Sequence, residues 1–243
     1  MSDERPIDTA IIIAAGDGTR WGNHTGVPKH LAPFHGEPLI TRTVKQALAI
    51  ADMVFPVVPE DDDRYYDAIS LVDAAERRRV RPVNPLHDDR WGGVAKFMSS
   101  KDLWADPGWT AVLYGDVYFT PDAVMRVAEV AIDGSPGDWR LVSRLGPSRL
   151  TGTRWGECFA QVFHHGAIDR HLAALRACMA MEASGQLRRT GGWEHYRLMT
   201  GGDPRAHRDY GMRVEVDDWT EDFDFPDDYD QWRANRRAAG LSV

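Results

Sequence analysis

The chain has 243 residues but only two cysteines, four lysines and no long apolar run. Cys158 and Cys178 lack the spacing of a metal site or of a disulfide framework, so we expect two buried thiols in a reducing compartment. The N-terminus lacks the apolar core of a secretory signal, and no segment approaches membrane-spanning length. These absences predict a cytoplasmic protein without a membrane partner.

Several common phosphate-binding and catalytic motifs are also missing. Gly16, Gly18 and Gly22 do not have the G-x-G-x-x-G spacing of a dinucleotide site, and the Gly-Lys-Ser/Thr of a P-loop is absent. The chain has neither a G-x-S-x-G elbow nor an H-E-x-x-H helix, which argues against a serine nucleophile and a zinc peptidase site. The net charge of -8 does not indicate a nucleic-acid partner.

What the chain does contain is a regular succession of apolar segments. Apolar content of 43% and charged content of 27% are those of an ordinary globular protein, and we expect a single α/β domain over residues 1–243. Apolar runs predict strands at residues 11–13, 53–58, 80–83, 109–114, 139–145, 157–163 and 212–216. Helical spacing predicts helices at residues 39–49, 61–79 and 168–181, and two more after Thr120 and Pro226.

The first strand runs into a loop with the composition of a phosphate-binding site. Gly16 and Gly18 follow the strand directly, where backbone amides must approach anionic oxygens without a Cβ in the way. Arg20 adds a planar fork and Lys29 a point charge, the two kinds of cation that suit a polyphosphate. Since lysine is scarce in this chain, Lys29 is not an ordinary surface lysine.

Carboxylates at two other strand ends could complete a site for a divalent cation. Asp116 follows the strand at residues 109–114, and Thr120 already supplies the cap of the next helix, so Asp116 is not needed there. Asp222 and Asp224 occupy alternate positions, which places both carboxylates on one side of an extended segment. A hard cation bound by such carboxylates and by substrate phosphates is typical of Mg²⁺.

The segments AAGDGTR, at residues 14–20, and PKHL, at residues 28–31, resemble the signature of nucleotidyltransferases with a GT-A-like fold. This group includes sugar-1-phosphate nucleotidylyltransferases and bacterial choline-phosphate cytidylyltransferases. The resemblance implies a nucleotide-diphospho-sugar transferase fold, a single-domain three-layer α/β/α sandwich with a mixed, mostly parallel sheet. It also implies a nucleotide-binding half at residues 1–120 and an acceptor-binding half at residues 121–243.

The resemblance also implies roles for individual residues. Arg20, Lys29, Asp116 and Asp224 would be catalytic, and Mg²⁺ or Mn²⁺ would be held by Asp116 and Asp224 with Asp222 beside them. The implied nucleotide-binding residues are Ala14, Ala15, Gly16, Gly18, Thr19, Arg20, Arg90, Gly92 and Gly93. For Arg90, Gly92 and Gly93 an ordinary turn before a helix is an equal alternative.

The acceptor side carries fewer implied residues. Glu157 begins a strand at the place where the family recognises its acceptor, so it is a candidate acceptor residue. The chain departs from the family at Phe225, where a small residue such as threonine is usual. The segment at residues 191–208 is either a mobile lid or an oligomer contact.

The expected activity is Mg²⁺-dependent transfer of an NMP group from an NTP to a phosphorylated acceptor, either a sugar-1-phosphate or a phospho-alcohol, with release of pyrophosphate. The alternative is a glycosyltransferase on the same scaffold that uses a nucleotide-sugar donor, possibly on a macromolecule such as modified DNA. A third alternative is a catalytically silent binding module. The base, the acceptor and the oligomeric state stay open.

Overall fold

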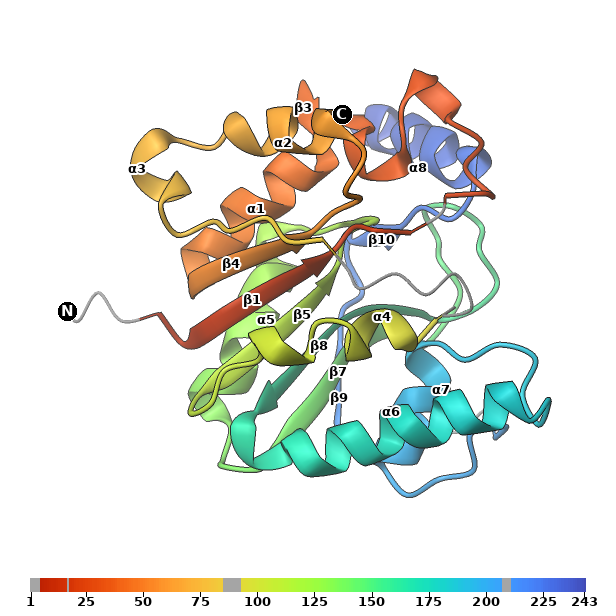
Figure 1. Ribbon diagram of the computed structural model, residues 1–243. Helices are drawn as coiled ribbons and strands as arrows, with labels where there is room; N and C mark the ends of the chain where they lie inside the picture. Colours follow the sequence, from red (N-terminus) through yellow and green to blue (C-terminus); the bar gives the residue numbers. More distant parts are fainter. Residues whose placement is uncertain (1–4, 17, 85–92, 207–210) are drawn as a thin grey trace.

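A computed structural model of the chain describes residues 5–16, 18–84, 93–206 and 211–243. Its centre is a six-stranded sheet with strand order β4-β1-β5-β8-β7-β9 (Figure 1). The strands are β1 (Ile7–Ile13), β4 (Ala51–Val57), β5 (Trp109–Tyr114), β7 (Trp139–Arg144), β8 (Glu157–His164) and β9 (Arg213–Glu215).

The direction of the strands brings several of their ends to one edge of the sheet. β1 pairs in parallel with both β4 and β5, with Ile11 opposite Phe55 and Val112. β8 is antiparallel to both of its neighbours, while β7 and β9 are parallel to each other. Because β8 runs the other way, its first residue, Glu157, lies at the edge where β1 and β5 end. The expected mixed, mostly parallel sheet is confirmed.

Helices cover both faces of the sheet, as the three-layer prediction requires (Figure 1). Ala10 and Ile12 of β1 pack against α1 (Leu39–Ile50) and α5 (Pro121–Asp133). Ile11 and Ile13 point to the other face, which is covered by α4 (Ala95–Met98), α6 (Ile168–Ala183) and α7 (Gly192–Met199). Every residue from Ala10 to Ala15 is therefore buried.

A third apolar cluster lies beyond the edge of the sheet where β1 and β5 end. The C-terminal helix α8 (Pro226–Ala238) contributes Tyr229 and Trp232, which pack with Trp21, Phe34 and Phe223. Two short ladders adjoin this cluster: β2 (Pro33–Phe34) with β3 (Glu37–Pro38), and β6 (Val117–Tyr118) with β10 (Glu221–Asp222). Single turns of 3-10 helix are η1 (His24–Gly26), η2 (Lys29–Leu31), η3 (Lys101–Leu103) and η4 (His165–Ala167).

The single helix expected at residues 61–79 is wrong, because the structure has two short helices there. They are α2 (Asp63–Ser70) and α3 (Ala74–Arg77). Val72 between them is buried in the core, and the carboxylate of Asp73 accepts a hydrogen bond from the backbone N–H of Ala75 at 2.8 Å. Asp73 thus caps a new helix. The strand expected at residues 80–83 is also wrong, since only isolated bridges join Val80 and Val83 to β4.

Other expectations from the sequence hold. The helices α1 and α6 and the strand β4 lie within a few residues of their predicted positions, and both cysteine thiols are buried. Within residues 191–206, α7 packs Tyr196 and Met199 into the core beside α6. In the part of the chain that the structure describes, no helix combines the length and the apolar character needed to cross a bilayer.

Candidate active site

The loop after β1 is held in shape by its own backbone and by Trp21. The backbone N–H of Ala14 donates to the carbonyl of Val57 at 2.9 Å, which extends the pairing of β1 with β4 into the loop. Gly18 has a φ of +59°, a conformation that glycine adopts without strain. The buried indole of Trp21 donates to the carbonyls of His24 at 3.1 Å and Val27 at 2.9 Å. The loop is therefore anchored on both sides of Arg20.

Arg20 faces the C-terminal part of the chain. Its guanidinium contacts the carboxylate of Asp224 at 2.5 Å, although the two residues are 204 positions apart. The same guanidinium lies over the ring of Phe225, 5.3 Å from the ring centroid. An aromatic face attracts a cation, so Phe225 adds a second contact that holds Arg20 beside the carboxylates. Phe225, where the resembled family usually has a small residue, therefore has a structural role beside the site.

Lys29 is the most enclosed charge of the site, with 8% of the residue exposed. It begins η2 immediately after Pro28. Its ammonium donates a hydrogen bond to Asp116 and lies 3.6 Å from Asp224. Burial would lower the pKa of Lys29, but the three nearby carboxylates of Asp116, Asp222 and Asp224 outweigh it and raise the pKa. Lys29 is therefore charged at any physiological pH.

Asp116, Asp222 and Asp224 converge although they come from the middle and the end of the chain. Asp222 pairs with Val117 across the β6–β10 ladder, and the backbone N–H of Phe223 donates to the carbonyl of Asp116 at 3.3 Å. The three residues each offer an oxygen, and these oxygens lie within 4.8 Å of one another. Phe223 is buried in the aromatic cluster, so Asp222 and Asp224 on either side of it face the cleft.

The environment shifts the pKa values of Asp116 and Asp222 in opposite directions. Burial would raise the pKa of Asp116, but the ammonium of Lys29 outweighs it and holds the pKa at about 2. Burial, together with the charges of Asp116 and Asp224, raises the pKa of Asp222 well above its usual value. Oδ1 of Asp222 is buried, and no described residue forms a hydrogen bond with it. A buried, unpaired carboxylate oxygen close to two other carboxylates fits a hard divalent cation.

A cavity of about 350 Å³ opens beside these carboxylates. Glu157, at the start of β8, lies on its wall with Asp222 and Asp224. Burial, followed by the charges of Asp224 and Glu221, raises the pKa of Glu157 to about 8. The segment before α7 and the start of α7 also line this cavity, with Arg189, Thr190, Gly191, Gly192, Trp193 and Glu194. The indole of Trp193 donates to the carbonyl of Gly156 at 3.0 Å, which holds α7 against the start of β8.

Gly93, shortly before α4, meets the segment before α7 directly. A Cβ at Gly93 would lie 1.6 Å from the carbonyl oxygen of Thr190, and Gly93 has a φ of +56°. Only glycine permits so close an approach. Gly93 therefore joins the two sides of the cleft, whereas Arg90 and Gly92 lie outside the described residues.

The predicted site residues of the first loop divide into lining and supporting residues. Arg20 and Gly16 line cavities of the cleft, and Ala14 and Ala15 are buried beneath the loop. Gly18 forms the turn, and Thr19 is exposed. The structure thus brings Arg20, Lys29, Asp116, Asp222, Asp224, Glu157 and Gly93 to one cleft.

Lys96 is a cleft residue that the sequence reasoning missed. Its ammonium lies 3.4 Å from the position that a Cβ on Gly16 would occupy. Together with Gly16, His30, Tyr114 and other residues it lines a cavity of about 100 Å³ that also reaches Asp116. The scarcity of lysine was the signal that could have found it, because two of the four lysines meet in this cleft.

His30 has a supporting position. Its ring is buried, and Nδ1 lies 2.9 Å from the hydroxyl of Tyr65. Burial lowers the pKa of His30 to about 3, so the imidazole is neutral at physiological pH. A neutral ring with a partner on α2 supports the floor of the loop rather than supplying charge to it.

Comparisons with known proteins identify the family and the fold of this chain. Residues 10–189 match the family model described as "MobA-like NTP transferase domain". No protein with a curated description matches the chain. Several solved structures resemble it over nearly the whole chain at low identity, so their likeness is one of fold.

Three of these structures illustrate the likeness. A Bacillus anthracis protein assigned as a glucose-1-phosphate thymidylyltransferase is 14% identical, with a TM-score of 0.64 over 94% of this chain and 95% of its own. The inositol-1-phosphate CTP transferase of T. maritima is 16% identical, with a TM-score of 0.59 over 98% and 99%. The CTP:phosphocholine cytidylyltransferase of Streptococcus pneumoniae is 14% identical, with a TM-score of 0.59 over 94% and 99%. The expected GT-A-like nucleotidyltransferase fold is confirmed.

Proposed function

Because this chain belongs to the family of MobA-like NTP transferase domains and is therefore a nucleotidyltransferase, we propose that it transfers an NMP group from an NTP to a phosphorylated small molecule and releases pyrophosphate. One observation carries the proposal. Arg20 and Lys29 meet Asp116, Asp222 and Asp224 in a single cleft, beside a cavity large enough for an acceptor.

In the proposed reaction an oxygen of the acceptor phosphate attacks the α-phosphorus of the NTP. A new P–O bond forms to the acceptor, and the bond between the α-phosphorus and the oxygen bridging to the β-phosphorus breaks. The electron pair leaves with pyrophosphate, so no protein nucleophile is required. The protein accelerates such a step by holding the two phosphates in line and by offsetting the charge that builds on the leaving group.

The charged residues of the cleft have different roles in this reaction. Arg20 and the backbone amides of Gly16 and Gly18 would bind the β- and γ-phosphates, because Arg20 lines the cavity and carries a planar fork. Lys29 is charged and fixed between two carboxylates, where it offsets phosphate charge near the α-phosphorus. Asp116, Asp222 and Asp224 would hold Mg²⁺ or Mn²⁺, which would supply Lewis-acid stabilisation of the developing phosphate charge.

The acceptor would occupy the cavity between Glu157 and Trp193. The solved structures with this fold include proteins named for glucose-1-phosphate, inositol-1-phosphate and phosphocholine. We therefore propose a sugar-1-phosphate or a phospho-alcohol as the acceptor class. Glu157 would accept hydrogen bonds from acceptor hydroxyls, and the indole of Trp193 offers an apolar face. A cytoplasmic location fits these substrates.

The alternative of a nucleotide-sugar-dependent glycosyltransferase has no observation in its favour. Such an enzyme keeps a metal carboxylate but does not need a pair of cations for a triphosphate. The contacts of Arg20 with Asp224 and of Lys29 with Asp116 favour the NTP. A silent binding module is equally disfavoured by the intact set of charged residues.

The test is a substrate matrix. Purified protein with Mg²⁺ is given each NTP in turn with glucose-1-phosphate, inositol-1-phosphate or phosphocholine, and pyrophosphate and the nucleotide product are measured. We expect release that depends on both the NTP and the acceptor, and that is lost in Asp116→Asn. No release from any combination would count against the proposal, and tighter binding of a UDP- or GDP-sugar than of any NTP would favour the glycosyltransferase.

A further inference from the structure

The strand that carries Asp222 is too short to fix its own position. Within the described residues, β10 consists of Glu221 and Asp222 and its ladder joins Val117 and Tyr118 of β6, continued by the single hydrogen bond from Phe223 to Asp116. Two paired residues give little backbone restraint, since an isolated two-stranded ribbon of greater length is already marginal in water. The position of Asp222 relative to Asp116 must therefore depend on the side chains next to it.

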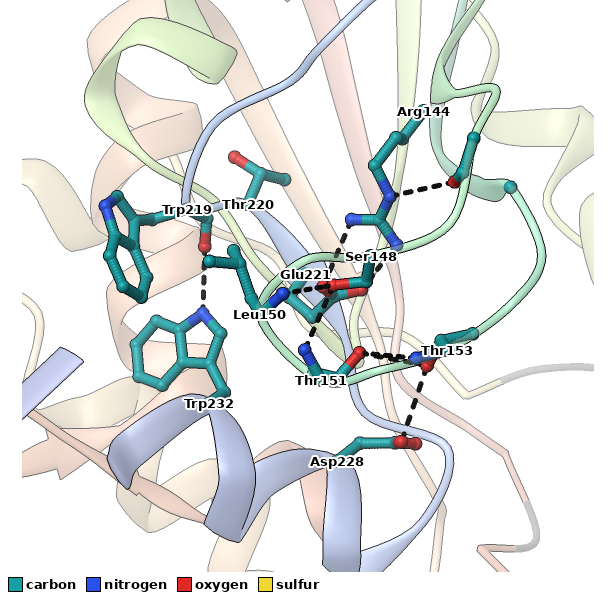
Figure 2. Close-up of polar contacts among 12 residues, drawn as sticks. Arg144, Ser148, Leu150, Thr151, Thr153, Trp219, Thr220, Glu221, Asp228 and Trp232 are labelled. Carbon is teal, nitrogen blue, oxygen red and sulfur yellow. Dashed lines mark hydrogen bonds and ion pairs between the residues drawn. The ribbon is translucent and has the colours of Figure 1, made fainter. Parts of the chain in front are cut away.

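Glu221 provides one such anchor. It is fully buried, and its carboxylate accepts two hydrogen bonds from Arg144 at the end of β7, at 2.9 and 3.1 Å. The hydroxyl of Ser148 donates a third hydrogen bond to the same carboxylate. Figure 2 shows the side chains of Arg144 and Ser148 meeting at the carboxylate of Glu221. The bidentate geometry fixes direction as well as distance, because the guanidinium and the carboxylate are both planar.

Phe223 provides the second anchor on the same segment. Its ring is buried among Phe34, Tyr229 and Trp232 of the aromatic cluster. Side chains alternate along an extended segment, so Glu221 and Phe223 point away from the cleft while Asp222 and Asp224 point into it. Asp222 is thus held between two buried anchors, one polar and one apolar.

The polar anchor also orders the loop at residues 145–153. The hydroxyl of Ser148 accepts hydrogen bonds from the backbone N–H groups of Leu150 at 3.0 Å and Thr151 at 3.1 Å. Nε of Arg144 donates to the carbonyl of Gly146 at 3.3 Å. Figure 2 shows the contacts of Ser148 with Leu150 and Thr151. The loop that leads to Glu157 and the strand that carries Asp222 therefore share one set of hydrogen bonds.

Stability alone is a weak reason for such an arrangement. Removing two charges from water is costly, and a buried ion pair contributes about as much as, or less than, well-packed apolar residues of the same volume. An apolar pair at these positions could fill the space, but it would not fix the direction of the strand. Partners that orient the ligands of a metal, by contrast, commonly change metal affinity about 10–100-fold when they are replaced.

We propose that Glu221, through its ion pair with Arg144 and its hydrogen bond with Ser148, is a positioning residue that sets Asp222 against Asp116 and joins the acceptor-side loop to the same strand. Glu221 itself is sealed from the cleft, so it does not touch substrate. The inference rests on the proposed function, because it assigns Glu221 to the geometry of that site.

The first experiment measures metal binding without substrate. Mn²⁺ is titrated into the metal-free protein and followed by its electron paramagnetic resonance signal, for the wild type, Glu221→Gln and Ser148→Ala. We expect Mn²⁺ affinity to fall roughly tenfold in Glu221→Gln and about threefold in Ser148→Ala. The matched control is Glu76→Gln, which removes the α3 carboxylate that pairs with Arg79 just beyond the end of that helix. Wild-type affinity in both test variants would overturn the proposal.

A double variant separates positioning from stability. Arg144→Met with Glu221→Leu replaces the ion pair by apolar side chains, and we expect thermal stability close to that of the wild type. Mn²⁺ affinity should nevertheless stay roughly tenfold weak, and turnover should need more Mg²⁺ for half its maximum. Recovery of both stability and Mn²⁺ affinity would overturn the proposal.

The two proposals fail in different ways. A wild-type protein that binds no Mn²⁺ would contradict the metal site and hence the proposed function. A wild type that binds Mn²⁺, with variants that bind it equally well, would contradict the positioning role alone. If the double variant does not fold, the decision rests on Ser148→Ala and Glu221→Gln, whose Mn²⁺ affinities test the same statement.

Discussion

The two sides of the cleft are built in different ways. On the nucleotide side, Gly16, Arg20 and Lys29 lie within fourteen consecutive residues. The charges of Arg20 and Lys29 are already matched by carboxylates. On the acceptor side, Glu157 and Trp193 come from a strand and a helix that meet only in the folded chain. The carboxyl of Glu157 makes no hydrogen bond within the described residues.

This difference indicates that the nucleotide side carries out the reaction, whereas the acceptor side selects the acceptor. A prearranged set of cations and carboxylates suits a reaction in which every substrate carries the same triphosphate. A wall assembled from separate elements, with an unpaired carboxyl and an indole, suits recognition of one particular acceptor. Variants on the nucleotide side should therefore affect all substrates, whereas variants on the acceptor side should affect one substrate more than another.

The largest effect is expected at Asp116, where the two sides meet. Asp116→Asn removes a carboxylate that pairs with Lys29 and faces Asp222, so both the cation site and the charge balance are lost. We expect kcat to fall roughly 10³-fold with every acceptor tested. Steady-state kinetics of pyrophosphate release measure this.

The control for Asp116 is Asp102→Asn, which changes an exposed aspartate outside the cleft and should leave kcat unchanged. If kcat of Asp116→Asn fell with one acceptor but not with another, Asp116 would belong to the acceptor side. That result would contradict the contrast between the two sides.

Arg20→Ala should give the second largest effect. It removes the guanidinium that reaches Asp224 and the loop, so we expect kcat/KM for the NTP to fall roughly 10²-fold. The KM of the acceptor should change little. The matched control is Arg188→Ala, an exposed arginine that does not line the cavity. A larger change in acceptor KM than in NTP KM would contradict the assignment.

Lys96→Met should have a smaller effect than Arg20→Ala, confined to the nucleotide side. The ammonium of Lys96 stands over Gly16, on the nucleotide side, so its loss should raise the KM of the NTP about tenfold and leave the acceptor KM unchanged. Lys101→Met serves as the control, since Lys101 is exposed on η3. An unchanged NTP KM in Lys96→Met would remove Lys96 from the site.

The same contrast explains what could be read from the sequence. The first loop was predictable because its glycines and cations are neighbours in the chain, and Asp116, Asp222 and Asp224 because each ends a strand or alternates along one. Arg189, Trp193 and Glu194 were not predictable, since they become site residues only where α7 packs beside β8. Lys96 was missed because its link to the first loop is a contact across space with Gly16.

Two errors in the secondary structure have the same cause. Residues 61–79 have helical spacing throughout, but burial of Val72 and the cap at Asp73 break the helix. Residues 80–83 are apolar enough for a strand, yet they meet β4 only through two isolated bridges. In both places tertiary contacts override a local pattern. The division into halves at residue 120 stays a prediction.

The smallest effect is expected at Glu157, and it concerns stability. The pKa of this carboxyl is about 8 in the folded protein, against an ordinary value of 4.5. Between these pH values the folded chain binds more protons than the unfolded chain, so the free energy of unfolding falls as pH rises. Glu157→Gln mimics the protonated form and removes this dependence. The variant should match the wild type at pH 5 and exceed it at pH 9.

Thermal melts in EDTA at pH 5 and pH 9 measure this difference. We expect a gain of order 1 kcal/mol at pH 9, or about 2–4 °C in Tm for a chain of this size. The control, Glu129→Gln on the exposed face of α5, should change neither melt. An equal Tm for Glu157→Gln and the wild type at pH 9 would mean that Glu157 already has a partner, and that the acceptor side is as fully matched in charge as the nucleotide side.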